Sequence, residues 1–325
     1  MRETTRLADR SSGPVISVDG LVKRYRKAER NAVDGVTFQV RPGELFALLG
    51  PNGAGKTTTI SVLTTTLAPT SGTVTVNGFD LMREPAAVRR SIGIIFQQPS
   101  LDLNLTAEEN VRLHAILYGI FPFRPTFSMM PKGYRDEVRR LAAILGIDDD
   151  LFKPIKTFSG GMRRKLEIVR SLIHKPRVLF LDEPTVGLDP ASRRSLWEYL
   201  RTVRAETGTT IFLTTHYLEE AEESDTICII NRGQVVSLGT PAQVKSELVQ
   251  HELLLDADDR DELRRELTML SIPFTETPLF RVPIDERGGG RSAQQIIKAI
   301  QTPLSVLQTR TPTLEDAYLS IVDPT

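Results

Sequence analysis

Residues 15–245 alternate between short apolar runs and amphipathic segments. Glycine and polar turn residues bound the apolar runs, which is the pattern of buried strands. These runs lie at 15–18, 36–40, 44–49, 74–76, 91–96, 178–181, 210–214 and 227–230. Helical spacing follows several of them, at 57–63, 86–90, 162–173 and 190–200. Short apolar strands that alternate with helices predict an α/β fold with a parallel sheet covered on both faces.

Helical spacing dominates from about 100 to 175, and we expect this part to form a helical subdomain. Within it, the pattern of 107–145 is interrupted by 118–134, which holds three prolines and several aromatic residues. Proline lacks the backbone N–H that a helix interior needs. We therefore predict that 118–134 is a surface loop between two helices.

The hydrophobic pattern changes near residue 250. The last two predicted helices begin with capping boxes, Ser292 with Gln295 and Thr313 with Asp316. Residues 250–325 are expected to form a small α+β domain of ferredoxin-like type, in which we find no catalytic constellation. Its strands are predicted at 252–256, 279–284 and 304–309, and its helices at 260–270, 292–300 and 313–322.

Composition narrows the class of protein. The 325 residues are enough for two domains, and residues 1–14 are polar and charged, as in a flexible tail. Because 41 basic residues balance 41 acidic ones, no basic excess points to nucleic acid. The single Cys228 lies in an apolar run, which predicts a buried core residue and a reducing cytoplasm. A spanning helix needs about 20 mostly apolar residues, and no segment offers them, so work at a membrane would require a partner.

A glycine-rich loop follows the apolar run at 44–49. It fits the phosphate-binding pattern G-x-x-x-x-G-K-[ST]. Glycines let consecutive backbone N–H groups turn toward the α- and β-phosphates, and the dipole of the following helix favours anions. Lys56 is placed to reach the β- and γ-phosphates, and the Thr57 hydroxyl to ligate Mg²⁺. The candidate nucleotide-binding residues are Gly50, Pro51, Asn52, Gly53, Ala54, Gly55, Lys56, Thr57 and Thr58.

Polar residues also follow three other predicted strands. Because ligands bind at the carboxyl ends of strands in such sheets, these residues are candidates for the same site. Asp182 is a candidate Mg²⁺ ligand, and Glu183 is placed to polarise an attacking water. His216 is placed to donate a hydrogen bond to a γ-phosphate. Gln97 is placed to touch Mg²⁺ or the water, with Gln98 as the alternative.

A second glycine turn, Phe-Ser-Gly-Gly-Met at 158–162, opens a predicted helix. One chain thus carries a complete nucleotide pocket and a further phosphate clamp. This arrangement makes sense if two copies close head to tail over two ATP molecules. Tyr25, which precedes the first loop, is a candidate for stacking on adenine. Asp189 followed by proline is typical of a helix N-cap.

Together these motifs resemble an ATP-binding cassette (ABC) ATPase over residues 15 to about 245. The resemblance implies a P-loop NTPase fold with a mixed sheet core and a helical subdomain. It also implies that Tyr25 stacks on adenine, and that Ser159, Gly160 and Gly161 bind the γ-phosphate of the partner subunit's ATP. The matching motifs are Walker A at 50–57, the Q-loop at Gln97, the signature at 159–162, Walker B at 178–183, the D-loop with Asp189 at 187–189 and the switch His216.

Three further stretches are similar to exporter ATPase subunits of the daunorubicin-resistance type: Ser-Gly-Gly-Met-Arg-Arg, Thr-His-Tyr-Leu-Glu-Glu-Ala-Glu and residues 312–319. Two departures stand out. Phe158 and Met162 replace the usual Leu and Gln of the signature, although its phosphate-binding Ser-Gly-Gly is intact. Segment 118–134 is longer than the family's usual connection, and a contact with a membrane partner is the alternative to a plain surface loop.

The resemblance implies an ATP-hydrolysing motor subunit that binds ATP and Mg²⁺. Glu183, His216, Lys56 and Gln97 would be catalytic, and Thr57, Gln97 and Asp182 would hold the metal. Two copies would dimerise around ATP and drive separate transmembrane permease subunits from the cytoplasmic face of the membrane. An importer subunit and a soluble, non-transport ABC ATPase remain the alternatives. A small-molecule kinase or GTPase would not need the second clamp.

Overall fold

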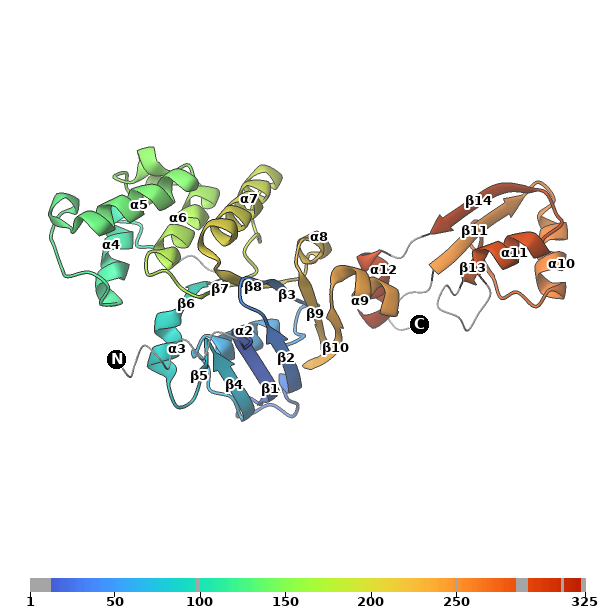
Figure 1. Cartoon of the computed structure of the whole chain (residues 1–325), viewed down its shortest axis with the longest axis horizontal. Helices are drawn as coiled ribbons and strands as arrows, with labels where there is room; N and C mark the ends of the chain where they lie inside the picture. Colours follow the sequence, from blue (N-terminus) through green and yellow to red (C-terminus); the bar gives the residue numbers. More distant parts are fainter. Residues whose placement is uncertain (1–12, 97–99, 249–250, 285–291, 311–312, 323–325) are drawn as a thin grey trace. The chain divides into compact units, whose positions relative to one another are not determined.

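The computed structural model describes residues 13–96, 100–248, 251–284, 292–310 and 313–322. The chain divides into two compact units, 1–238 and 239–325. Figure 1 shows the strands and helices of each unit. The first unit holds all the site residues predicted from the sequence.

A six-stranded sheet with the order β10-β9-β3-β8-β7-β6 forms the centre of the first unit (Figure 1). The pairs from β9 to β6 are parallel, as the sequence pattern predicted. β3, β7 and β8 are buried along their whole length, which is typical of strands covered on both faces. The strands are β3 (Leu45–Leu49), β6 (Ile92–Ile95), β7 (Val178–Asp182), β8 (Thr210–Thr215), β9 (Thr226–Asn231) and β10 (Gln234–Gly239).

The N-terminal strands form a separate antiparallel sheet with the order β2-β1-β4-β5. The prediction of one parallel sheet was wrong for these strands. Buried and exposed positions alternate along the second half of β2, which is typical of an antiparallel strand with one wet face. Parallel and antiparallel pairing thus occur together, as the ABC resemblance implied. The strands are β1 (Ile16–Lys23), β2 (Val33–Val40), β4 (Ser71–Val76) and β5 (Phe79–Asp80).

One hydrophobic core joins the two sheets and helix α2 (Lys56–Leu63). In this core, Phe38 of β2 stacks on Phe46 of β3 and Phe212 of β8, with ring centroids 5.1 and 5.9 Å away. Ile60 of α2 belongs to the same cluster, and so does Cys228, which is buried as predicted. The segment between β3 and α2, residues 50–55, is therefore anchored at both ends.

Three helices pack together between β6 and β7: α4 (Ala107–Leu117), α5 (Lys132–Ile144) and α6 (Gly160–Leu172). Tyr134 of α5 is fully buried, and its hydroxyl donates to Oε1 of Glu108 at 3.0 Å. Phe121 and Phe127 pack edge-on against the Tyr134 ring. Residues 118–131 are therefore a loop whose aromatic residues pack against α5, with one 3-10 turn at Phe127–Met129. The predicted loop, 118–134, was three residues too long, because 132–134 form the first turn of α5. Its contact with a membrane partner stays a prediction.

The remaining helices of the first unit connect its strands. α3 (Pro85–Ser91) precedes β6, α7 (Pro190–Thr207) precedes β8, and α8 (Leu218–Glu222) follows β8. Asp189 caps α7 as predicted, with its side chain accepting from two backbone amides of the first turn. Among the described residues, no helix combines the length and apolar character that crossing a membrane requires.

The second unit has the order of elements β-α-β-β-α-β, the ferredoxin-like arrangement. Its antiparallel sheet has the order β12-β13-β11-β14. The Ser292–Gln295 capping box is present, and α9 and α12 pack against one another. The elements are α9 (Pro241–Leu248), β11 (His251–Ala257), α10 (Arg260–Met269), β12 (Thr275–Glu276), β13 (Phe280–Ile284), α11 (Ala293–Ala299), β14 (Leu304–Arg310) and α12 (Leu314–Val322).

Candidate functional site

Backbone geometry explains the glycines of the loop between β3 and α2. Gly55, the N-cap of α2, has a φ of 109°, and a Cβ there would lie 2.5 Å from the carbonyl oxygen of Ala32. At Gly50 a Cβ would lie 2.3 Å from the carbonyl oxygen of Ile230. Only glycine fits both positions. The loop thus delivers the chain to the N-terminus of α2, where unpaired N–H groups favour an anion.

The side chain of Lys56 lies inside this loop. Lys56 is only 5% exposed, and its Nζ donates to the carbonyl oxygens of Gly50 at 2.7 Å and Pro51 at 3.2 Å. Burial lowers the pKa of Lys56, and the carboxylates of Glu183 and Asp182 oppose this shift. The ammonium group is therefore held beside two acids at the mouth of a backbone anion site.

Asp182 and Glu183 lie at the carboxyl end of β7. Oδ1 of Asp182 accepts from Oγ1 of Thr214, on the neighbouring β8, at 2.5 Å. Burial raises the pKa of Asp182, while this hydrogen bond lowers it. The amide of Glu183 donates to both the carbonyl oxygen and the hydroxyl of Thr214, each at 3.1 Å. Thr214 thus holds both acids in place.

Glu183 also has an uncommon backbone conformation. Its φ of 45° lies in the left-handed region, which residues with a Cβ seldom occupy. Such strain persists only where the surrounding structure imposes it, and it concentrates at functional sites. Here the two hydrogen bonds from the Glu183 amide to Thr214 impose it.

Two nitrogen atoms from different elements converge on Oε1 of Glu183. Nζ of Lys56 lies 3.5 Å from this oxygen, and Nδ1 of His216 lies 3.3 Å from it. Lys56 begins α2, Glu183 follows β7 and His216 follows β8. Parallel strands end at the same edge of a sheet, so residues distant in sequence meet there.

Tyr25 lies beside the same helix. Its hydroxyl is 3.2 Å from Oγ1 of Thr58, and the residue is 47% exposed. The ring is therefore accessible for stacking next to the loop that ends at Lys56. Gln97 and Gln98 lie outside the described residues, so their role stays a prediction.

The second glycine turn lies beside the start of α7. Ser159 is the N-cap of α6, and Ser159 and Gly160 are exposed. A Cβ at Gly161 would lie 2.8 Å from Oγ of Ser192, whose amide donates to the N-cap Asp189. The predicted signature and D-loop are thus neighbours, and their exposed backbone is open to a partner molecule.

Sequence reasoning missed two residues of this region. Thr214 is one of them, and its only sequence signal is its position as the last residue of the apolar run at 210–214. Glu220 of α8 is the other. It is buried, and it accepts hydrogen bonds from the hydroxyls of Thr185 and Thr215. Nothing in the local sequence distinguishes Glu220 from the exposed Glu219 beside it.

The residues present fit a magnesium ion. Mg²⁺ in nucleotide sites is held by one or two protein oxygen ligands together with substrate phosphates. Asp182 supplies a buried carboxylate at the end of β7, and Thr57 supplies an exposed hydroxyl in the first turn of α2. These are hard oxygen donors of the kind that Mg²⁺ prefers.

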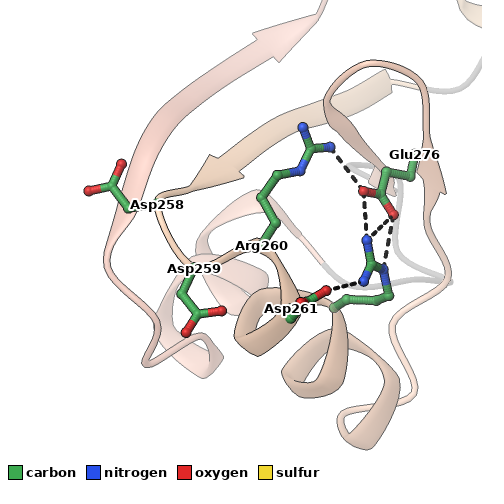
Figure 2. A pocket seen from close by; sticks show the side chains of 6 residues that line it. Asp258, Asp259, Arg260, Asp261 and Glu276 are labelled. Carbon is green, nitrogen blue, oxygen red and sulfur yellow. Dashed lines mark hydrogen bonds and ion pairs between the residues drawn. The ribbon is translucent and has the colours of Figure 1, made fainter.

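A second polar cluster, in the second unit, is an ion-pair network (Figure 2). Arg264 donates to both carboxylate oxygens of Glu276, and Arg260 donates to one of them at 3.0 Å. Asp261 also pairs with Arg264, while Asp259 is the N-cap of α10. These contacts join α10 to β12 on an exposed surface, where ion pairs contribute little to stability. We assign this cluster a structural role.

Comparisons with known proteins show the family to which the chain is similar. The family described as ABC transporter matches residues 33–186. The daunorubicin/doxorubicin resistance ATP-binding protein DrrA of Streptomyces peucetius is 42% identical over 78% of this chain and 74% of its own length. DrrA3 of Streptomyces coeruleorubidus is 35% identical over 94% of this chain and 95% of its own length. The Nod factor export ATP-binding protein I of Ralstonia nicotianae is 40% identical over 80% of this chain and 78% of its own length.

Solved structures give the same result for the fold. An ATP-binding subunit of an ABC transporter is 32% identical, with a TM-score of 0.62 over 78% of this chain and 99% of that chain. A dimeric bacterial ABC transporter cassette is 26% identical, with a TM-score of 0.61 over 69% of this chain and 98% of that chain. The identity to DrrA over most of both chains decides the subtype. This protein therefore belongs to the ABC transporter ATPases of the DrrA type.

Proposed function

We propose that this protein is the ATP-hydrolysing motor subunit of an ABC exporter and that it energises a separate membrane permease. The observation that carries the proposal is the convergence of Lys56 and His216 on the carboxylate of Glu183. Relatives named for daunorubicin resistance and for Nod factor export support the direction of transport. The match to DrrA3 covers 94% of this chain, so it extends into the second unit.

The loop between β3 and α2 binds the phosphates of ATP. Its backbone N–H groups, from Asn52 to Thr58, cradle the α- and β-phosphates, and Lys56 pairs with the β- and γ-phosphates. The exposed ring of Tyr25 stacks on the adenine. The buried ammonium of Lys56 exchanges the loop carbonyls and Glu183 for phosphate oxygens when ATP binds.

Hydrolysis relies on groups at the carboxyl ends of β7 and β8. Glu183 accepts a hydrogen bond from a water and orients it for in-line attack, while His216 donates to the γ-phosphate. Thr57, Asp182 and Gln97 would hold Mg²⁺, which when bound neutralises the charge of the phosphates. Thr214 keeps Asp182 and Glu183 in register through its hydroxyl.

Two copies of the chain act together. Ser159, Gly160 and Gly161 of one subunit clamp the γ-phosphate of the ATP held by the other, and Asp189 shapes the adjoining D-loop. The exposure of Ser159 and Gly160 and the dimeric assembly of a similar cassette support this arrangement. Closure of the dimer reorients permease subunits, which hold the protein at the cytoplasmic face of the membrane. No nucleic acid takes part.

The test is purification of the Glu183→Gln variant from membranes with ATP and Mg²⁺. We expect it to bind ATP with wild-type affinity, to lose most turnover and to trap a dimer that carries a polytopic membrane protein. Glu219→Gln, on exposed α8 surface, is the matched control and should behave like wild type. Wild-type turnover by Glu183→Gln would remove the assigned role. A trapped dimer with no membrane protein attached would favour a non-transport ABC ATPase.

A further inference from the structure

Arg164 of α6 is a buried charge that the proposed reaction does not use. It is 7% exposed and lies in the second turn of the helix that Ser159 caps. Its Nε donates to the carbonyl oxygen of Pro184 at 3.1 Å, and its Nη1 donates to the carbonyl oxygen of Phe96 at 2.6 Å. The guanidinium of Arg164 thus joins α6 to two other segments. One is Pro184, the residue after Glu183, and the other is Phe96, the residue after β6.

Two further residues of α6 extend this contact. Glu167 is 1% exposed; its Oε2 accepts from Arg164 at 3.0 Å and its Oε1 accepts from the amide of Ser100 at 2.9 Å. Arg170 donates to the carbonyl oxygen of Ser100 at 2.8 Å and to its hydroxyl. One face of α6 therefore holds both Phe96 and Ser100, the described residues on either side of 97–99.

Stability alone does not account for this network. Removing the charges of an arginine and a glutamate from water is costly, and well-packed apolar residues in their place are often neutral or stabilising. What the planar guanidinium provides is geometry, because its fixed fork of donors binds two separate carbonyl groups at once. An apolar side chain has no donors, and a lysine presents its three donors from a single nitrogen, so neither reproduces this fork.

We propose that Arg164 is a positioning residue that couples the signature end of α6 to the loop carrying Glu183. This inference rests on the proposed function, in which Ser159 contacts the partner's ATP while Glu183 acts on the subunit's own ATP. When Ser159 engages the partner's ATP, a shift of α6 pulls on the carbonyls of Pro184 and Phe96 through Arg164. This shift changes the position of Glu183 at the subunit's own ATP. Arg164 thereby makes hydrolysis at the two sites of the dimer cooperative.

The experiment measures ATPase rate against ATP concentration for the purified full chain. Two coupled sites give a Hill coefficient up to about 2, and we expect Arg164→Lys to lower it to about 1 and kcat by about tenfold. Arg164→Met combined with Glu167→Gln, which removes both charges, should do the same. Binding of a fluorescent ATP analogue, which needs only the first loop, should change less than about twofold. Arg194→Met, on the exposed surface of α7, is the control.

Each outcome decides the proposal. A wild-type Hill coefficient in Arg164→Lys would overturn it. Loss of nucleotide affinity together with a lowered melting temperature in both Arg164 variants would also overturn it, because the role would then be purely structural. If the wild-type chain hydrolyses ATP with a Hill coefficient of about 1, only this inference fails. If the wild-type chain does not hydrolyse ATP at all, the proposed function fails with it.

Discussion

Nζ of Lys56 lies 3.5 Å from Oε1 of Glu183, and both side chains are almost fully shielded from solvent. The ammonium comes from the first turn of α2 and the carboxylate from the residue after β7, so the pair joins these two elements. His216 approaches the same oxygen. A change at any one of these residues therefore alters the electrostatic surroundings of the other two.

Replacement of Lys56 by methionine should weaken ATP binding by at least about tenfold, because a charge-assisted contact with phosphate contributes roughly 1.5–3 kcal/mol. The measurement is titration of the purified chain with a fluorescent ATP analogue. Lys132→Met, at the exposed start of α5, is the matched control and should bind normally. Unchanged affinity in Lys56→Met would show that this lysine is not a phosphate ligand.

Replacement of Thr214 by valine should lower kcat by about tenfold or more with little change in the affinity for ATP. Valine keeps the shape of threonine but removes the hydroxyl that donates to Asp182 and accepts from the Glu183 amide. Two lost hydrogen bonds of about 1 kcal/mol each are enough for this effect. Steady-state ATPase assays would test it, with Thr202→Val on exposed α7 as control. Equal kcat values for the two variants would contradict the role given to Thr214.

Glu220 should make the first unit less stable as pH rises. Burial raises the pKa of Glu220, so the folded state holds the proton more tightly than the unfolded state does. In the unfolded state the pKa of this side chain is near 4.5. Stability is therefore greatest below that value and falls as pH rises through the folded pKa. Glu220→Gln, which stays neutral, should gain stability relative to wild type between pH 4.5 and 8 in urea unfolding followed by Trp197 fluorescence. A constant difference across this range would refute the assignment.

Glu266 in the second unit should show the opposite dependence. Burial disfavours its charge, but hydrogen bonds from the Thr302 hydroxyl and from the amides of Gln301 and Thr302 outweigh it and lower the pKa of Glu266. The resulting stabilisation is present at pH values above 4.5, the ordinary pKa of glutamate, and is lost as pH falls through the lowered pKa of Glu266.

Glu266→Gln should therefore destabilise the second unit at pH 7 by about 1–3 kcal/mol, and the difference from wild type should shrink below pH 4. Circular dichroism follows unfolding of both units, whereas Trp197 is the chain's single tryptophan and reports on the first unit. We expect only the circular dichroism transition to move. Glu262→Gln, on the exposed face of the same helix, serves as control. A matching shift in Trp197 fluorescence would show that the two units unfold together.

Local signals in the sequence were sufficient for most elements of the fold. Apolar runs predicted β3, β7, β8 and β9, and the pattern Asp189-Pro190 predicted the start of α7. Such signals work because burial, capping and turn formation depend on residues close together in the chain. The glycines at Gly50 and Gly55 were also readable, since few other motifs place Gly, Lys and Thr in this order after a strand.

The sequence by itself thus determined the family and which residues are candidates for the chemistry. Only the tertiary structure decided that β1, β2 and β4 pair antiparallel, and that Thr214 binds Asp182, Glu220 binds Thr185 and Arg164 binds the carbonyl oxygen of Pro184. The physical reason is that their partners come from distant segments. The register of β7 against β8 sets Thr214 opposite Asp182, and no local pattern encodes that register.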